Sequence, residues 1–529
     1  MRVPSYPAPR SPNLPPNRPP NFPPNFPPNP PPNFPGASAR APAEPARRSG
    51  LRRAMSRDTL PVIALWTFTA LLILAHQGTV LTLAFPVLAI GVGFWLYFVN
   101  PVRYIGFMWW LWFLSPEVRR LADYGKGGFT PTSLIQVAPL AVTMISGISL
   151  IRYYPILAQR RGLPLLLALL GIAYGFAVGV VASGPAAAVY DLANWVYPLL
   201  IGFHIMVLTR QYPDARDTII NTFIWGMFVM GAYGLVQFFI MPPWDAMWMI
   251  GSDMNSQGDP VPLGVRVFST MNSSGPFAFA MMGAMVLVMA AKHRVRWVAA
   301  AFGFFSFALS LVRSTWGGWA IAMVIQLMKS SNKVRIRIIV SALVLAGVCV
   351  PLLTFGPVAD RMQQRLNSLV NLSDDQSYEA RNQFYADFAK KAFTDVSGEG
   401  FGSTGASTKL SSSNGQLGQY GSFDSGVMNI PFVLGWPGTL LYMSGVIWLM
   451  VRALRIALRL SEDRYVCACM SLMISIFAML VFTNSLVGTG GLLLFSSVFS
   501  ILSAGHWTRL NRLASRATPV VTPVTEISD

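Results

Sequence analysis

The stretch GPVADRMQQRLNSLVNLSDDQSYEARNQFYADFAKKAFTD, residues Gly356 to Asp395, decides the fold because it is polar and lies between long apolar runs. It opens a polar segment that continues through VSGEGFGSTG and a Ser/Gly-rich patch to about Pro431. Nowhere else after Leu60 do so many charged residues collect outside a hydrophobic run. Chemistry on a polar substrate is therefore expected in this segment and on the helix ends that face it.

The sequence on either side of this segment is typical of a membrane protein. Of its 529 residues, 53% are hydrophobic and 12% are charged, whereas a soluble globular protein carries about twice that charged fraction. Many apolar runs reach 17 to 22 residues, enough for a helix to cross roughly 30 Å of hydrocarbon. We predict an all-α, polytopic helical membrane protein with about 12–14 transmembrane helices and one large periplasmic loop.

Fourteen spans fit the pattern best, and the third and tenth are the shortest of them. The predicted spans are residues 60–76, 78–98, 102–115, 132–151, 163–182, 188–208, 219–241, 270–291, 296–312, 314–328, 336–355, 432–451, 465–484 and 487–505. With the N-terminus inside, every inside segment carries Lys or Arg, as the positive-inside rule requires. Both termini are then expected to be cytoplasmic.

The same pattern divides the chain into five parts. They are a Pro/Asn-rich cytoplasmic tail (1–59), a first set of transmembrane helices (60–355), the large periplasmic loop (356–431), C-terminal transmembrane helices (432–508) and a second cytoplasmic tail (509–529). In the first tail Asn recurs every fourth residue from Asn13 to Asn33. Such a segment cannot bury a core, so we expect it to be disordered. Met55 offers an alternative start.

Charge, cysteines and histidines exclude several functions. The net charge of +18 is spread over short loops, which indicates orientation in the membrane rather than a nucleic-acid partner. Three cysteines without metal-binding spacing and four scattered histidines indicate neither a metal site nor a cofactor. The chain also contains no Walker loop, HExxH or GxSxG motif.

Charged residues gather instead at the predicted outer ends of spans. Arg266 and Arg313 lie there, Asp191 begins a span on the same side, and Asp245 lies in an outer loop. Each arginine could simply lie at the lipid interface or form a local ion pair. Guanidinium groups also bind phosphate oxygens bidentately, and a carboxylate can accept the proton of an attacking hydroxyl. These parts suit displacement of a diphosphate from a sugar carbon, as on a polyprenyl diphosphate, without a metal.

Two features of the large loop leave alternatives open. The motif SGEGFGSTG, Ser397 to Gly405, has glycines that let a backbone approach a substrate, but a flexible linker explains it equally well. Asp424 is either a general base or a cap of the following helix. For Arg361 and Arg365, which are four residues apart on a predicted short helix, a solvated helix face is favoured.

Four segments in the second half resemble the O-antigen ligase and Wzy-type polysaccharide polymerase superfamily. They are RVFSTMNSSGPFAFAMM (266–282), SLVRSTWGGWAIA (310–322), ARNQFYADFAKKAFTDVSGEGFGSTG (380–405) and DSGVMNIPFVLGWPGTLLY (424–442). They are similar, in order, to two signatures at outer span ends, to an Arg/aromatic segment with a GxGxG element, and to the opening of a later span. The resemblance covers roughly Arg266 to Val451.

This resemblance implies metal-independent, inverting glycosyl transfer at the outer face of the inner membrane, with an undecaprenyl diphosphate-linked oligosaccharide as substrate. It implies that Arg266 and Arg313 contact the donor diphosphate, and that Arg381 contacts diphosphate or sugar. Ligases of the family carry a catalytic His near the place of Asp424, but this loop contains no His. The base is then Asp424 or Glu379, and a polymerase of exopolysaccharide or O-antigen repeat units is favoured.

Two other functions remain as alternatives. An O-antigen or glycan ligase would transfer to a different acceptor. A transporter or flippase of lipid-linked glycans would share the many-helix architecture, although transporters often place ionisable residues near the membrane midplane rather than at span ends. The lipid bilayer and the lipid-linked oligosaccharide are the expected partners, and a chain-length regulator and a flippase are further candidates.

Overall fold

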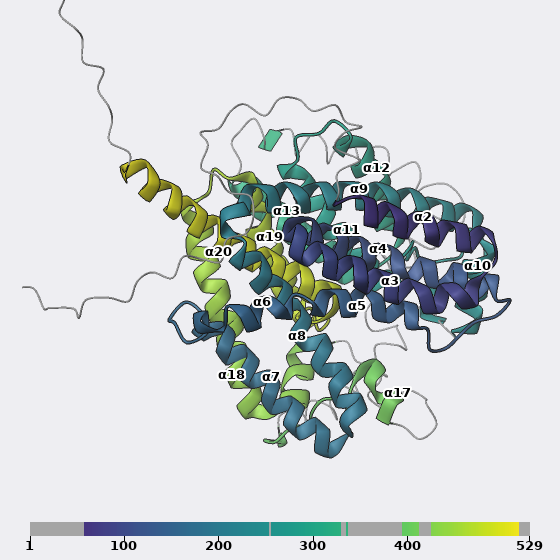
Figure 1. The fold of residues 1–529 in the computed structure, drawn as a ribbon, viewed down its shortest axis with the longest axis horizontal. Helices are drawn as coiled ribbons and strands as arrows, with labels where there is room; N and C mark the ends of the chain where they lie inside the picture. Colours follow the sequence, from purple (N-terminus) through teal and green to yellow (C-terminus); the bar gives the residue numbers. More distant parts are fainter. Residues whose placement is uncertain (1–57, 253–254, 330–334, 337–393, 412–424, 518–529) are drawn as a thin grey trace, which may run out of the picture. The chain divides into compact units, whose positions relative to one another are not determined.

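The structure is a computed structural model that describes residues 58–252, 255–329, 335–336, 394–411 and 425–517. The chain divides into two units, Met1–Ala54 and Met55–Asp529, and all described residues belong to the second. Regular structure in these residues is helical throughout (Figure 1), with one isolated bridge between Gly258 and Val265. The predicted all-α fold class is confirmed. Apart from Asp58 and Thr59, the predicted N-terminal tail lies outside the described residues.

Eight segments of this unit are long and apolar enough to cross a membrane. They are α3 (Gly78–Val99), Leu134–Arg152, α7 (Leu163–Ala182), α8 (Pro185–Val207), Thr209–Ile240, α18 (Gly426–Arg459), Arg464–Val481 and Gly488–Ser515. Three shorter apolar helical segments are Leu60–Leu74 (α2), Ser274–Ala290 and Arg296–Leu309 (α12). The chain is therefore a multi-pass membrane protein.

Four of these segments contain more than one helix, and one is part of a longer helix. Leu134–Arg152 contains η1 (Leu134–Gln136), α5 (Val137–Met144) and α6 (Gly147–Arg152). Thr209–Ile240 contains α9 (Tyr212–Ile240), Ser274–Ala290 contains α11 (Ser274–Leu287), Arg464–Val481 contains α19 (Arg464–Ala478), and Gly488–Ser515 lies within α20 (Gly488–Ala517). The remaining α-helices are α4 (Pro101–Gly125), α10 (Pro243–Gly251), α13 (Arg313–Lys329) and α17 (Thr408–Ser411).

Several helices extend beyond the predicted spans; α9 begins at Tyr212 rather than at 219, and α20 continues to Ala517 rather than to 505. Helices α4 and α18 show why. Helix α4 continues to Gly125, although the predicted span ends at residue 115, because the charged residues that follow pair with one another along the helix. Helix α18 begins at Gly426 rather than at 432, because Asn429 and Pro431 interrupt the apolar run without ending the helix. Helices α4 and α13 contain the two shortest predicted spans, and neither is among the eight long apolar segments. Span 336–355 lies almost wholly outside the described residues, so the total of 12–14 remains a prediction.

Contacts between helix ends agree with the predicted alternation across the membrane. At one end, which we name the Arg266 end, contacts join Gln136 to Asn272, Arg266 to Leu311 and Asn429 to Asn484. At the other, the Asp58 end, contacts join Asn100 to Asp58, Arg452 to Arg161 and Tyr212 to Asp463. Each of these pairs joins two segments that the sequence predicts to lie on the same side. Which end faces the cytoplasm remains a prediction.

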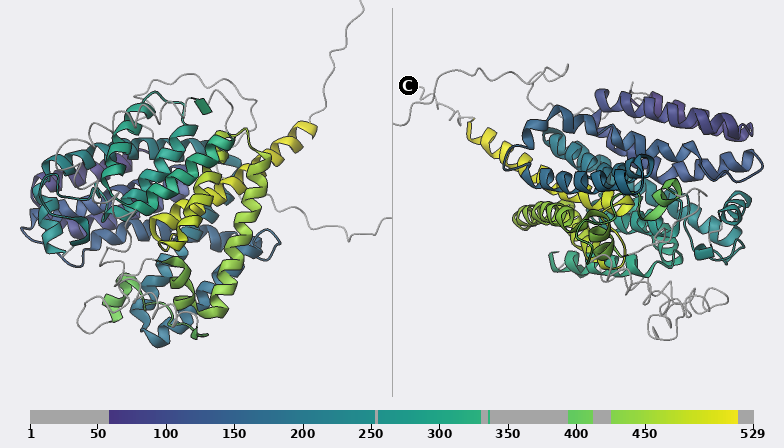
Figure 2. Two further views of the ribbon diagram at one scale, coloured as in Figure 1. Left: turned by 180° about the vertical axis from the view of Figure 1, so that it is seen from behind. Right: turned by 90° about the horizontal axis from the view of Figure 1, so that it is seen from below.

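Large apolar side chains of α2 and α3 lie on the surface. Leu71 is 58% exposed, Leu74 is 77% exposed and Val87 is 68% exposed. In the right-hand view of Figure 2 these two helices, coloured purple, run along one edge of the unit. An extended apolar surface of this kind fits contact with lipid.

Helices α7 and α18 lie side by side through small residues (Figure 1). A Cβ atom on Gly171 of α7 would lie 2.5 Å from the carbonyl oxygen of Gly438, and one on Gly445 of α18 would meet the backbone of Pro164. Glycine allows two helix backbones to approach this closely, which is a common way of packing membrane helices. The sequence positions also show that α7 and α18 run antiparallel.

Helix α18 is broken at Gly435, whose backbone angles are φ 60° and ψ 178°. Pro431 and Pro437 flank the break, and proline removes a helical hydrogen-bond donor. The break leaves carbonyl groups of the first part, Gly426 to Leu434, to be satisfied from outside the helix. Two of these carbonyl groups, those of Phe432 and Val433, accept hydrogen bonds from the Gly-rich segment.

Candidate functional site

The structure describes two of the five predicted site residues, Arg266 and Arg313. The other three, Glu379, Arg381 and Asp424, lie outside the described residues, as do Arg361 and Arg365. The candidate site therefore consists of the segments that carry Arg266 and Arg313 and of the described part of the large loop, residues 394–411.

Arg266 is half-buried, and its guanidinium faces three backbone carbonyls. Nη1 donates to the oxygen of Ser256 at 2.9 Å, Nε to that of Ser310 at 3.3 Å and Nη2 to that of Leu311 at 3.2 Å. A guanidinium carries N–H groups on all three nitrogens in a fixed plane. Arg266 thus joins its own segment to the connection between α12 and α13, a more specific role than an arginine extended to the lipid interface.

The hydrogen bonds of Arg266 to Ser310 and Leu311 bring its segment into contact with the segment that leads to Arg313. The backbone nitrogen of Val267 donates to the oxygen of Leu309 at 3.1 Å. Leu311 has a φ of 54°, which turns the chain into α13, and Arg313 is the first residue of that helix. The N-terminus of a helix carries partial positive charge. Arg266, Arg313 and the N-terminus of α13 therefore lie in neighbouring segments at the Arg266 end.

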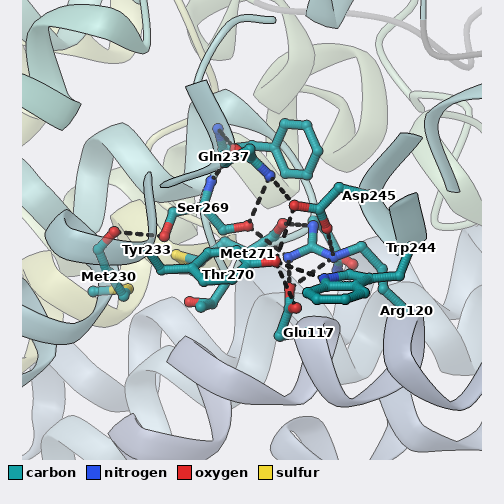
Figure 3. A network of polar contacts seen from close by, with 12 residues as sticks. Glu117, Arg120, Met230, Tyr233, Gln237, Trp244, Asp245, Ser269, Thr270 and Met271 are labelled. Atoms are coloured by element: carbon teal, nitrogen blue, oxygen red, sulfur yellow. Dashed lines mark hydrogen bonds and ion pairs between the residues drawn. The ribbon is translucent and has the colours of Figure 1, made fainter. Parts of the chain in front are cut away.

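The buried side chain of Arg120 contacts the backbone of the chain that follows Arg266 (Figure 3). Nη1 of Arg120 donates to the carbonyl oxygen of Met271 at 2.9 Å, and Nη2 donates to that of Ser269 at 2.5 Å. The guanidinium lies 4.9 Å from the centre of the Phe268 ring. One side chain of α4 thereby fixes the path of residues 268–271.

Two carboxyl groups accompany Arg120 in this buried position. Nε of Arg120 lies 2.9 Å from Oε2 of Glu117, which Nη2 also contacts, and 2.9 Å from Oδ1 of Asp245. The Arg120 side chain is 1% exposed and that of Asp245 is 0% exposed. Burial of three ionisable groups is costly unless they are paired and hydrogen-bonded.

Gln237 of α9 completes the support of the segment. Its Oε1 accepts from the backbone nitrogens of Phe268 at 3.0 Å and Ser269 at 2.8 Å. Its Nε2 donates to Oδ2 of Asp245 at 2.7 Å. Ser269 has a φ of 51°, so these bonds stabilise a backbone conformation that is uncommon outside glycine.

Sequence reasoning did not find this cluster. The spacing of Glu117 and Arg120, and of Arg119 and Asp123, is that of neighbours on one helix face, and it could have shown that α4 continues past residue 115. No sequence pattern joins Arg120 to Asp245 or to the backbone of Met271, because the partners are far apart in the chain. Asp245 was predicted only as a charge in an outer loop.

The Gly-rich motif of the large loop is an ordered segment inserted between α7 and α18. Gly398, Gly400 and Gly402 have φ values of 74°, 76° and 90°. The nitrogens of Glu399 and Gly400 donate to the oxygens of Phe432 at 2.8 Å and Val433 at 3.1 Å, next to the break in α18. The segment therefore satisfies the carbonyls that the break releases.

Close backbone approach explains the glycine at position 400. A Cβ atom there would overlap the backbone of Gly179 on α7, and the φ of 76° is one that L-residues rarely adopt. The flexible-linker interpretation is wrong for residues 396–405. The observed close approach is to helix backbone within the protein.

Asp191 anchors the same segment from α8. Its Oδ2 accepts from the backbone nitrogen of Gly402 at 2.7 Å and from Oγ of Ser407 at 2.8 Å. Phe401, which is fully buried, stacks on Trp195 with ring centroids 5.7 Å apart. Asp191 is thus a structural partner of the large loop at the Arg266 end.

Polar side chains also meet where α18 begins. Nδ2 of Asn429 donates to Oγ1 of Thr404 at 3.2 Å, and Nδ2 of Asn484 donates to Oδ1 of Asn429 at 2.8 Å. Ser425, the residue after Asp424, occupies the N-cap position of α18. The Gly-rich segment, the start of α18 and the turn before α20 therefore share the Arg266 end.

Among the described residues, no group of three or more His, Cys, Asp or Glu side chains is arranged to hold a metal ion. Comparison of the chain with protein-family models and with curated proteins found no match.

Proposed function

We propose that the protein is a polysaccharide polymerase, a metal-independent inverting glycosyltransferase that joins undecaprenyl diphosphate-linked oligosaccharide repeat units into an exopolysaccharide or O-antigen. One observation carries the proposal. Arg266 bonds to the carbonyl of Leu311, two residues before Arg313 at the start of α13. Two arginines predicted to bind one diphosphate thus come from segments that are in direct contact.

The chemistry follows from the charge of the reacting groups. A hydroxyl oxygen of the acceptor sugar attacks the anomeric carbon of the growing chain, and the bond from that carbon to the diphosphate breaks. Undecaprenyl diphosphate leaves with the bonding electrons, and positive groups stabilise the charge that it gains. Arg266 and Arg313 serve this purpose, together with Arg381. The hydroxyl proton passes to Asp424 or Glu379.

The proposal assigns the Arg266 end to the periplasm, both termini to the cytoplasm and the protein to the bacterial inner membrane. Cysteine labelling tests this assignment in a variant without its three native cysteines. Lys409→Cys, on an exposed residue of α17, should react with a membrane-impermeant reagent added outside, and Arg160→Cys should react only after permeabilisation. The opposite pattern would contradict the assignment.

The break in α18 is the observation that favours a transporter, because transporters often bind substrates at broken helices near the membrane midplane. This break lies level with Gly175, close to the middle of α7, so its depth is compatible with a transporter. Carbonyls on its N-terminal side accept from the Gly-rich segment. A ligase would use the same arginines with another acceptor.

Arginine substitutions in cells test the proposed function. Arg266→Ala and Arg313→Ala should each reduce polymer roughly a hundredfold, since loss of one charge-stabilising donor costs about 3 kcal/mol of barrier. Single lipid-linked repeat units, the unjoined substrate, should accumulate. Lysine at either position should restore activity only in part, because an ammonium cannot reproduce the planar fork.

The matched control is Arg216→Ala, an arginine on α9 paired with Asp217 at the Asp58 end. It should leave polymer unchanged. Normal polymer in both Arg266→Ala and Arg313→Ala, at normal protein levels, would refute the proposed site. Accumulation of polymer that is not transferred to its acceptor would favour the ligase.

A further inference from the structure

The hydroxyl group of Tyr233 lies among three polar atoms in the buried cluster (Figure 3). Nε1 of Trp244 is 2.7 Å away, Oε1 of Glu117 is 2.8 Å away and Oδ2 of Asp245 is 3.0 Å away. Indole nitrogen can only donate, so Trp244 donates to the Tyr233 oxygen. The single hydrogen of the phenol can then bond to one of the two carboxyl groups, not to both.

If both carboxyl groups were ionised, the other contact would place two oxygen atoms together without a hydrogen. The cluster would also carry a net charge of −1, from +1 on Arg120 and −1 on each of Glu117 and Asp245. Two carboxylates that share a buried site cannot readily ionise together. One added proton supplies the missing hydrogen and removes the net charge.

The groups that face these two carboxyls come from each neighbouring element. Helix α4 contributes Arg120 and α9 contributes Tyr233 and Gln237, while Trp244 of α10 reaches the phenol. Arg120 is the one cation among these partners. It can balance one carboxylate.

We propose that Glu117, Tyr233 and Asp245 hold one shared carboxylic proton, which makes their cluster with Arg120 electrically neutral. In one arrangement Glu117 is protonated and donates to Tyr233, which donates to Asp245. In the other, Asp245 is protonated and donates to Tyr233, which donates to Glu117. Moving two hydrogens along the chain interconverts the two, so the proton belongs to the group rather than to one residue.

The shared proton explains how the cluster can support the segment after Arg266. Arg120 must bring its charge close to the carbonyls of Ser269 and Met271 in a buried position. A neutral cluster can be buried there at much lower cost than one with an unbalanced carboxylate. This inference does not depend on the proposed function.

Infrared difference spectroscopy of the purified full-length protein at neutral pH tests the proposal. A protonated carboxyl has a C=O stretch at higher wavenumber than a carboxylate. The spectrum of the wild type minus that of Glu117→Gln should contain one such band, because in the variant the remaining Asp245 ionises against Arg120. Asp245→Asn should lose the same band, since Glu117 then ionises.

Asp191→Asn is the control, because Asp191 is another buried carboxyl of the same end and lies in a different set of contacts. Its spectrum should retain the band that Glu117→Gln loses. Absence of a protonated-carboxyl band from the wild-type-minus-Glu117→Gln spectrum would overturn the proposal. If Asp245→Asn fails to fold, the isosteric Glu117→Gln variant alone decides the question.

Discussion

Two irregular segments lie at the Arg266 end, and they are held in opposite ways. Residues 266–271 are fixed by side chains, since Arg120 and Gln237 reach their backbone from α4 and α9. Residues 396–405 are fixed mainly by backbone, since glycines allow them to contact α7 and α18 directly. The first segment should be sensitive to the loss of a side chain, and the second to the gain of one.

The two segments also differ in the ionisable groups that support them. The segment after Arg266 rests on three buried ionisable groups, so its conformation depends on their pairing. Among the described residues, the buried carboxyl group of Asp191 accepts hydrogen bonds from the Gly-rich segment, which otherwise depends on backbone hydrogen bonds and close packing. The substitutions that follow test each form of support and are given from the largest expected effect to the smallest.

Arg120→Met should have the largest effect on stability. It leaves Glu117 and Asp245 buried without their cation, and breaking a buried ion pair costs about 3–5 kcal/mol. Denaturant or thermal unfolding in detergent measures the loss. Arg216→Ala is the control, because its pair with Asp217 is partly exposed, at 29% and 62%, and surface pairs contribute about 0–1 kcal/mol. Equal effects of the two variants would show that the buried cluster does not hold the segment.

Gly400→Ala should destabilise the protein by about 3 kcal/mol. Of this, about 1 kcal/mol comes from the positive φ and about 2 kcal/mol from overlap with the backbone of Gly179. The matched control is Gly405→Ala, where φ is 71° but no atom lies within 4 Å of the added Cβ. It should cost about 1 kcal/mol. If both variants unfold alike, close approach is not the reason for the glycine at position 400.

Asp191→Ala should destabilise by about 1–2 kcal/mol, because it removes the acceptor of the Gly402 nitrogen and the Ser407 hydroxyl. Asp191→Asn retains one acceptor oxygen and should lose less. Limited proteolysis near residue 405, compared with thermal unfolding of the same samples, separates local loosening from global destabilisation. An Asp191→Ala protein as stable and as protected as the wild type would remove Asp191 from the support of this segment.

Sequence predicted the fold class because long apolar runs leave a helix as the simplest way to satisfy the backbone in lipid. It missed the end of α4, since the charges after residue 115 stop an apolar run without stopping a helix. The glycines of the motif indicated close backbone approach, and the structure has positive φ at Gly398, Gly400 and Gly402. The sequence could not predict that Gly400 approaches Gly179, because Gly179 lies more than 200 residues earlier.

Only part of the candidate site could be predicted, because its supporting contacts join residues that are far apart in the sequence. The sequence named Arg266 and Arg313, and the segments that carry them are joined in the structure. Arg120 gave no signal as a support, because its carbonyl partners Ser269 and Met271 lie about 150 residues away. A carbonyl acceptor exists at every position, so no residue type marks this kind of contact in a sequence.

The most direct test of the proposed function uses purified protein in liposomes with an undecaprenyl diphosphate-linked oligosaccharide repeat unit. Wild-type protein should produce a ladder of longer lipid-linked chains and release one undecaprenyl diphosphate for each new glycosidic bond. Arg266→Ala and Arg313→Ala should reduce both products together by about a hundredfold. Movement of the lipid-linked oligosaccharide across the bilayer without any new glycosidic bond would contradict the account.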